Sequence, residues 1–600
     1  MARADGWHPV RARARQVDRG GAVAQPAAMV PLFRPLLRAL GLMLLSAASA
    51  CAQAPVVTSS AETMRLQSAS VATGTAAATY TVTLTVDNDN GNSALPTSFR
   101  RWWHCQVGNL DPAGTTLQVR VANAGYTDII LPVWSLSTDG TNFGPYVRCP
   151  VSAVPVYTSS QHRFTLVTPP GVRAIRLAKF FPYSVTRKDA WLQSLANHPR
   201  RVATEVLGNS AQGRPIHMLT FTDASVPDAA KKRVWIHAGV HPSETPAYFA
   251  VEGLVSWLGS GTPLAEALMD ATILHIVPMP NPDGVFVGNY RTTSTSVNLE
   301  EQWSAPYAST VPEIVAMRTR IEQYMGTVAA PASNPISVLL NLHSTHNVAF
   351  PFHFRHVANA NWQPGTTSSG VIPAVHDAEQ RWIDALDAAS PFNALGTTQN
   401  STLGSRPYVE SMMHDRWTAV PGWLTAPNNE DPVMAITWEG TYGRGPDGTT
   451  WCTEQDHRDV GTGMGLALAQ YYGVSLGSVA ESYGASCGPS VMAGTIRASG
   501  ASRFVDVLVG GAPASALGWL AIGFTQQNLP LPAPFGPCPL LTDVAGTTSL
   551  GFSPVGTATA SLLVPPIPGL SANLQAIAAD FSTPVAALGT SNGVRVRNTF

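Results

Sequence analysis

Apolar and polar residues alternate along the chain from about residue 55 to residue 185. The runs Tyr80–Val86, Leu117–Val121 and His162–Val167 place apolar side chains at nearly every second position. Turn-forming clusters such as Asp87–Gly91 separate these runs, and no long helical pattern interrupts them. This alternation is typical of strands that bury one face, and it predicts an N-terminal β-sandwich domain over residues 55–185.

The pattern changes between residues 186 and 475, where short apolar runs alternate with stretches of helical periodicity. The predicted strands are Arg233–Ala238, Thr272–Pro278, Ser337–His343 and Val433–Glu439, and the predicted helices are Pro246–Leu258, Val311–Tyr324, Val375–Ala389 and Val460–Tyr472. Such alternation predicts an α/β domain whose sheet carries helices on both faces. Residues 476–600 are again rich in Gly, Pro and strand-like runs, which predicts a C-terminal all-β domain.

Composition limits the classes of partner. Charged residues are only 12% of the chain, against roughly 25% in average soluble domains, and the formal net charge is −1. This balance gives no reason to expect binding to nucleic acid or to an anionic membrane surface.

Residues 1–54 are predicted to be an N-terminal extension with an export signal. A basic region at Met29–Arg38 precedes the apolar run Ala39–Ala48, and small residues lead up to Gln53. This order is typical of a signal peptide, with Met29 as a candidate start and cleavage after Ala52. The apolar run is too short to span a bilayer, and no later stretch has transmembrane character. We therefore expect a periplasmic or extracellular protein, with a lipoprotein anchored through Cys51 as the alternative.

The remaining cysteines contain no Cys-x-x-Cys pair, which argues against a thiolate zinc site. In an exported chain, pairing within each flanking domain is expected, as Cys105–Cys149 and Cys487–Cys538. Cys452 is then left as a buried thiol.

Chemically competent residues follow the predicted strands of the α/β domain. His241 and Glu244 come after the first strand, and His343 and Glu439 end the third and fourth. In open α/β sheets, ligands bind beyond the carboxyl ends of the strands. Imidazole and carboxylate are zinc ligands, and three protein ligands leave a fourth position for water. We predict one Zn²⁺ bound by His241, Glu244 and His343, with Glu439 as the general base.

Several motifs together resemble the zinc metallocarboxypeptidase family. They are His241-Pro-Ser-Glu244, Asn281-Pro-Asp-Gly284, Asn341-Leu-His343 and Thr437-Trp-Glu439, preceded by Gly208-Asn-Ser-Ala-Gln-Gly-Arg-Pro215. The run from Asn281 to Arg291 and the junction Phe181–Ser184 are similar to the cytosolic-type branch, which includes tubulin deglutamylases. The resemblance implies a carboxypeptidase-like mixed sheet, and it implies that Arg291 polarises the scissile carbonyl. A fixed guanidinium beside a developing oxyanion would stabilise the transition state selectively.

One segment departs from the family pattern. The family usually continues into Asp-Leu-Asn-Arg, whose Asn-Arg pair binds the substrate carboxylate, whereas this chain reads Asn298-Leu-Glu300-Glu301. Two acidic groups would repel a carboxylate. Three explanations stay open: another basic residue such as Arg355 or Arg406 holds the carboxylate, the substrate presents a cation at Glu300 and Glu301, or exopeptidase activity is lost. Tyr408 is a candidate proton donor.

The sequence therefore predicts an exported zinc-dependent peptidase, acting on a peptide or peptide-like substrate through a water activated by zinc and Glu439. An amidase or deacylase acting on cell-wall or modified amino-acid substrates is the first alternative. A non-catalytic binding protein with a degenerate specificity pocket is the second. The sequence does not indicate an oligomeric state.

Overall fold

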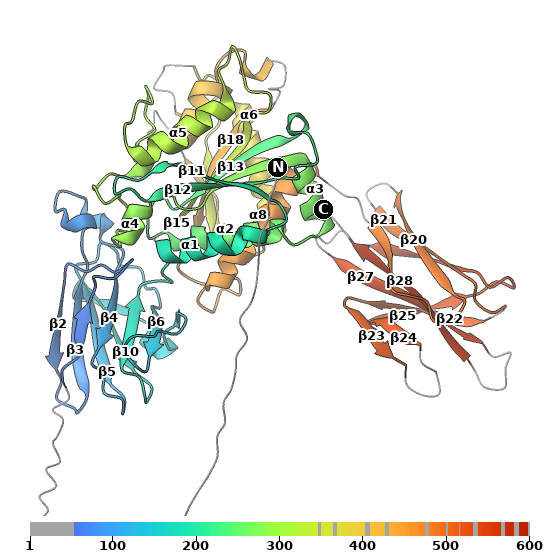
Figure 1. Cartoon of the computed structure of the whole chain (residues 1–600), viewed down its shortest axis with the longest axis horizontal. Helices are drawn as coiled ribbons and strands as arrows, with labels where there is room; N and C mark the ends of the chain where they lie inside the picture. Colours follow the sequence, from blue (N-terminus) through green and yellow to red (C-terminus); the bar gives the residue numbers. More distant parts are fainter. Residues whose placement is uncertain are drawn as a thin grey trace, which may run out of the picture. The chain divides into compact units, whose positions relative to one another are not determined.

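The computed structural model describes residues 53–597 except for short internal segments (Figure 1). The segments left out are 346–349, 364–368, 402–407, 426–430, 475–478, 500–501, 515, 532–537, 566–569 and 581–586. The predicted export signal lies outside the described residues. Within the described part, no helix combines the length and the apolar character that a membrane span needs.

The N-terminal part consists of two five-stranded sheets that enclose one hydrophobic core. In spatial order, the first sheet contains β1 (Val56–Thr58), β4 (His104–Gly108), β10 (Ala174–Ala178), β6 (Val133–Ser137) and β7 (Val147–Arg148), and the second contains β2 (Ser68–Thr73), β3 (Thr79–Thr85), β5 (Thr116–Ala122), β9 (Gln161–Val167) and β8 (Val156–Thr158). Burial alternates along β3, where Tyr80, Val82 and Leu84 face the core. The period-2 pattern thus follows from one buried face per sheet.

The predicted pairing of Cys105 with Cys149 is wrong, because both thiols are free and buried. Cys105 lies on β4, whereas Cys149 follows β7, and β10 and β6 lie between these strands. Three strand spacings of about 4.8 Å separate the two positions by roughly 14 Å. A disulfide needs Cα atoms within about 7 Å, so the sheet order excludes the bond. Cys452 is also a free, buried thiol, as expected.

The central part contains an eight-stranded mixed sheet. Its spatial order is β11 (Arg201–Asn209), β12 (Pro215–Phe221), β14 (Thr272–Val277), β13 (Lys232–Ala238), β15 (Ile336–Ser344), β18 (Met434–Gly440), β16 (Phe352–His356) and β17 (Gln399–Ser401). Strands β14, β13, β15 and β18 run parallel, while β12 and β16 pair antiparallel to the two sides of this group. The four predicted strands form this parallel centre, within one or two residues of their expected bounds.

Helices cover both faces of the sheet (Figure 1). On one face lie α2 (Thr245–Leu258), α3 (Pro263–Ala271), α6 (Pro373–Ala389) and α8 (Glu454–Tyr471), and on the other lie α5 (Pro312–Met325) and α7 (Val409–Met413). Val234 and Ile236 of β13 pack into the first core, whereas Trp235 packs into the second. The strand is therefore apolar on both faces, as parallel strands of an α/β sheet are.

The N-terminal sheets and the central part share packed surface. Trp102, Ile130 and Val133 belong to the same hydrophobic core as Tyr248 and Phe249 of α2. Helix α1 (Val185–Ser194) follows the last strand of the N-terminal part, with Ser184 as its N-cap. Helix α2 in turn packs closely on α8. The two helices approach so closely at Gly253 that a Cβ there would lie 1.9 Å from the carbonyl oxygen of Arg458. These contacts fix the helix that begins at the predicted metal ligands.

The C-terminal part is all-β over its described residues (Figure 1). One sheet contains β19 (Val479–Tyr483), β28 (Ala587–Arg597), β27 (Ser571–Asp580), β22 (Leu517–Gly523) and β25 (Gly546–Gly551), a second contains β20 (Val491–Ser499), β21 (Ser502–Gly510) and β26 (Ala558–Val564), and a third contains β23 (Gln526–Pro530) and β24 (Pro539–Thr542). The first two sheets share one core. The predicted disulfide Cys487–Cys538 is present.

Candidate active site

A sharp turn after β13 brings His241 and Glu244 to the carboxyl edge of the sheet. Gly239 has φ of +75°, and a Cβ there would lie 2.2 Å from the ring of Tyr248. Only glycine fits both the conformation and the space. Helix α2 then begins at Thr245 with Glu244 as its N-cap residue. The turn between strand and helix therefore lets two side chains three residues apart point to the same place.

His343, near the end of β15, completes a group of three converging ligands. Its Nδ1 lies 2.8 Å from Oε2 of Glu244 and 3.1 Å from Nδ1 of His241, whose Nδ1 is 2.8 Å from Oε1 of Glu244. All three side chains are buried, and their ligand atoms can hold one metal ion. Tetrahedral zinc ligands at 2.0–2.1 Å from the metal lie about 3.3 Å from one another. The donor set and its spacing therefore fit one Zn²⁺.

Two further side chains orient the imidazoles. Nε2 of His241 donates to Oδ1 of Asn298 at 3.1 Å, and Nε2 of His343 donates to Oε2 of Glu300 at 3.2 Å. With the proton on Nε2, each ring presents the lone pair of Nδ1 to the metal position. Burial disfavours a positive charge on His343, but the charges of Glu300 and Glu244 outweigh it and raise its pKa well above 6.5. The site thus attracts positive charge.

Glu439 lies beside this group, at the end of β18. Burial, followed by the charge of Glu244, raises the pKa of Glu439 to about 8. Its Oε2 is buried and has no hydrogen-bond partner among the described residues. The side chain lines the same cavity as the three ligands. A carboxylate with a high proton affinity and a free oxygen is suited to accept a proton from water.

Arg291 lines the cavity together with Tyr290. Its guanidinium lies 5.5 Å from the centre of the Phe99 ring, which belongs to the N-terminal part. Burial disfavours the charged guanidinium, but Tyr290, Glu244 and other acidic groups outweigh it and raise the pKa of Arg291. Among the described arginines and lysines, Arg291 is the one that lines the cavity.

The structure separates the two acidic residues that replace the family's Asn-Arg pair. Glu300 is buried and lines the cavity, where the charge and hydrogen bond of His343 outweigh burial and lower the pKa of Glu300 to about 2. Glu301 is exposed and lies outside the cavity lining. The two residues follow each other in a 3₁₀ turn at Leu299–Glu301, so their side chains point about 120° apart.

The cavity has a volume of about 350 Å³ and contains groups that sequence patterns did not single out. Glu410 of α7 accepts from Thr437 Oγ1 at 2.6 Å and from Asn341 Nδ2 at 3.0 Å, and Asn341 Nδ2 also donates to Glu300 at 3.1 Å. Burial and then the charge of Glu300 raise the pKa of Glu410. No spacing to a metal ligand marks Glu410, because it reaches the site from a separate short helix.

The remaining candidates have different positions. Tyr408 lines the cavity. Arg355 is outside the cavity lining, where its Nη2 lies 2.6 Å from Nε2 of His376. Arg406 lies outside the described residues, so its position relative to the cavity stays a prediction.

A buried His-Glu-His group at the carboxyl edge of a mixed α/β sheet, with a carboxylate beside it, defines a metal-dependent hydrolase site. Residues 189–370 match the family described as zinc carboxypeptidase. Residues 189–370 therefore form a zinc carboxypeptidase-like domain, and the His-Glu-His group could hold one zinc ion.

Sequence relatives point to one branch of that family. Cytosolic carboxypeptidase 6 from Homo sapiens is 35% identical over 151 residues, which is 25% of this chain and 30% of the relative. Cytosolic carboxypeptidase 6 from Caenorhabditis elegans is 30% identical over 211 residues, which is 33% of this chain and 44% of the relative. The chain thus spans less than half the length of these relatives.

Solved structures share the fold over a longer stretch. A metallo-carboxypeptidase from Burkholderia cenocepacia aligns with a TM-score of 0.53 at 22% identity, covering 70% of this chain and 99% of that one. A metallo-carboxypeptidase from Pseudomonas aeruginosa in complex with (2-guanidinoethylmercapto)succinic acid aligns with a TM-score of 0.52 at 19% identity, covering 69% and 99%. These similarities establish a carboxypeptidase-like fold.

Proposed function

We propose that this chain hydrolyses peptide bonds as a zinc-dependent carboxypeptidase. The observation that carries the proposal is the convergence of His241, Glu244 and His343, with Glu439 lining the same cavity. Bound zinc lowers the pKa of a water ligand and polarises a carbonyl oxygen. In this role Glu439 accepts the proton of the attacking water and then transfers it to the leaving amine.

Arg291 is assigned to the substrate carbonyl. Arg291 lines the same cavity as the metal ligands. A positive group fixed beside the carbonyl oxygen stabilises the negative charge that develops there in the transition state. Ground-state binding gains less from this contact, so we expect Arg291 to act mainly on kcat.

End specificity is the part of the proposal that departs from the family. Glu300 is engaged by His343 and Asn341, so we propose that it orients a metal ligand instead of binding a substrate carboxylate. Glu301 is exposed and lies outside the cavity lining, so its predicted role in substrate binding has no support from the cavity. The three explanations for the missing Asn-Arg pair are as follows. Another basic residue holds the carboxylate, which favours Arg406 because Arg355 lies outside the cavity lining; the substrate presents a cation at Glu300, which lines the cavity, whereas Glu301 does not; or exopeptidase activity is lost.

A peptide library tests the reaction. Zinc-loaded full-length protein is incubated with peptides that end in acidic, basic or neutral residues, with free or amidated C-termini, and products are identified by mass spectrometry. Release of single C-terminal residues supports the proposal, and the preferred ends distinguish the first two explanations. Cleavage of acyl amides instead would favour the alternative amidase or deacylase. Absence of any turnover would favour a binding protein with a degenerate pocket.

We also propose that the chain is exported. The signal-like pattern at Met29–Ala52 supports export, and so does the Cys487–Cys538 disulfide, because disulfides persist in oxidising compartments. The sequence relatives carry the word cytosolic in their names. Mass spectrometry of native protein should find Gln53 as the first residue and Cys487 linked to Cys538. An intact N-terminus together with reduced thiols at both positions would contradict export.

The domain boundaries are proposed as 55–185, 186–475 and 476–600. The first boundary is supported by the gap between β10, which ends at Ala178, and α1, which begins at Val185. The second lies between the end of α8 at Tyr471 and the start of β19 at Val479. Two sheets around one core support the assignment of the N-terminal domain as a β-sandwich.

A further inference from the structure

Arg291 lies in an irregular segment, residues 287–298, called here the Arg291 loop. It contains neither helix nor strand and connects α4 (Pro282–Phe286) to the 3₁₀ turn at Leu299–Glu301. An irregular segment has no ladder of backbone hydrogen bonds to hold it, so its amide groups need other acceptors. The position of the Arg291 side chain therefore depends on which groups accept hydrogen bonds from the loop amides.

Asp89 of the N-terminal part supplies three of these acceptor contacts. Its Oδ1 accepts from the backbone N–H of Tyr290 at 2.7 Å, and its Oδ2 accepts from those of Arg291 at 2.8 Å and Thr292 at 2.7 Å. The Asp89 side chain is only 2% exposed. Hydrogen bonds from amides to a carboxylate are roughly twice as strong as neutral ones. Three of them on consecutive residues fix the backbone on both sides of Arg291.

Asn90 adds hydrogen bonds to the Arg291 loop on both sides of Arg291. Its Nδ2 donates to the carbonyl oxygen of Thr293 at 2.9 Å and to Oγ of Ser296 at 3.0 Å, and its Oδ1 accepts from Nδ2 of Asn289 at 3.0 Å. Asn90 has a positive φ of 59°, a conformation that asparagine tolerates better than most residues. The Asp89-Asn90 pair thus contacts the loop before, at and after Arg291.

We propose that Asp89 is a positioning residue for Arg291, so that the N-terminal β domain completes the active site of the α/β domain. The inference rests on the proposed hydrolysis, because it assigns the effect of Asp89 to the carbonyl-polarising guanidinium. Asp89 itself does not line the cavity and acts through the loop backbone. Displacing a catalytic group by about 1 Å can lower a rate by about 100-fold.

The test is a double-mutant cycle on zinc-loaded full-length protein, assayed with the best peptide of the library. Asp89→Asn keeps the shape of the side chain but replaces one acceptor oxygen with a donor that faces backbone N–H groups. We expect kcat to fall roughly 10- to 100-fold, with a smaller change in KM. When Arg291→Ala is already present, Asp89→Asn should lower kcat by less than about threefold, because the two residues act in series.

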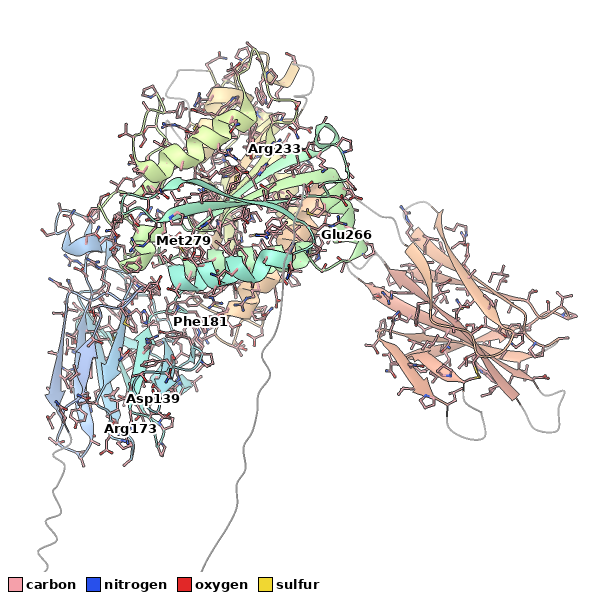
Figure 2. All side chains as sticks on the ribbon, in the orientation of Figure 1. Asp139, Arg173, Phe181, Arg233, Glu266 and Met279 are labelled. Carbon is pink, nitrogen blue, oxygen red and sulfur yellow. A yellow bond between two sulfur atoms is a disulfide. The ribbon has the colours of Figure 1, made fainter. Side chains whose placement is uncertain are left out.

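Asp139→Asn is the matched control. Asp139 also belongs to the N-terminal part, in the turn after β6, away from the Arg291 loop in sequence (Figure 2). Its carboxylate accepts the backbone N–H groups of Thr141 and Asn142. It makes the same kind of contact without touching the loop. This variant should keep the kcat and KM of the unmodified protein.

Hydrogen exchange gives a readout that does not depend on turnover. Amides of residues 287–298 should exchange faster in Asp89→Asn than in the unmodified protein or in Asp139→Asn, with unchanged zinc content. Equal losses of kcat with and without Arg291, or unchanged exchange in the loop, would overturn the positioning role. If the unmodified protein has no turnover, the proposed function fails, and the exchange data alone decide whether Asp89 holds the loop.

Discussion

Glu439 and His343 are register partners on neighbouring parallel strands, β18 and β15. Side chains at paired positions on adjacent strands project from the same face, so the sheet places the proposed proton acceptor beside the proposed metal ligand. Regular backbone holds both residues, which limits the freedom of the acceptor relative to the metal position. Catalytic geometry of this kind is more precise on strands than on loops.

Glu439→Gln should remove hydrolysis while leaving the metal in place. The amide cannot accept the proton of the attacking water, and loss of a general base typically costs about 10²- to 10⁴-fold in rate. Turnover and zinc content are measured on the same preparation. Glu205→Gln is the control and should keep full activity, because the Glu205 carboxylate on β11 pairs with Arg320 of α5. Equal activity of both variants would remove Glu439 from the mechanism.

His343→Ala should lose zinc as well as activity. The substitution removes one of three ligand atoms that lie within 4.8 Å of one another, and the remaining pair cannot form a closed three-ligand site. Elemental analysis of dialysed protein gives the metal content. His217→Ala, which changes a histidine on β12 outside the cavity lining, should retain about one zinc per chain. Retention of zinc by both variants would show that the metal binds elsewhere.

Glu300→Ala should weaken metal binding, whereas Glu301→Ala should not. Glu300 fixes the ring of His343 through Nε2, while its exposed neighbour contributes nothing to that bond. Loss of such an outer partner typically lowers metal affinity by roughly 10- to 100-fold. Competition with a fluorescent zinc chelator measures the difference between the two variants. If Glu301→Ala weakens zinc binding as much as Glu300→Ala does, the hydrogen bond between Glu300 and His343 does not explain the loss of affinity.

His353→Gln should flatten the loss of stability at acidic pH. Burial lowers the pKa of His353 to about 3, and its Nε2 accepts a hydrogen bond from Trp382 at 3.1 Å. The unfolded chain, with a histidine pKa near 6.5, binds the proton between these values, so the folded state loses stability as pH falls below about 6.5. Between pH 7.5 and pH 5 this histidine accounts for about 2 kcal/mol.

Glutamine retains an acceptor for Trp382 and does not titrate. The drop in the free energy of unfolding from pH 7.5 to pH 5, measured by urea denaturation, should therefore be smaller by about 2 kcal/mol in His353→Gln. An identical drop in the two proteins would mean that His353 is already protonated in the folded state.

The local pattern of apolar residues was sufficient to predict the strands that carry or precede the proposed metal ligands. Parallel strands buried on both faces are continuous apolar runs, so the strand ahead of His241 and the one ending in Glu439 were predictable to within a residue or two. His241 and Glu244 come shortly after β13, and His343 lies near the end of β15. Their convergence then follows from the shared carboxyl edge of the sheet.

Contacts between distant segments were not predictable in the same way. Asp89 lies in a turn cluster that looks like any polar loop, and only its contact with a backbone 201 residues later makes it notable. Cys105 and Cys149 are close in sequence, but strand order separates them. The sequence places Glu300 and Glu301 together, but it does not tell which side of a tight turn each residue faces, and Glu301 lies outside the cavity lining.

The Asp89 contact also restricts how this protein can be divided. A fragment that starts at α1 would keep all three metal ligands but would leave three adjacent amides of the Arg291 loop without their acceptor. Recombination that exchanges the N-terminal sheets for those of another protein would have to bring a carboxylate to the same spot. The two parts are therefore expected to be inherited, and best engineered, as one unit.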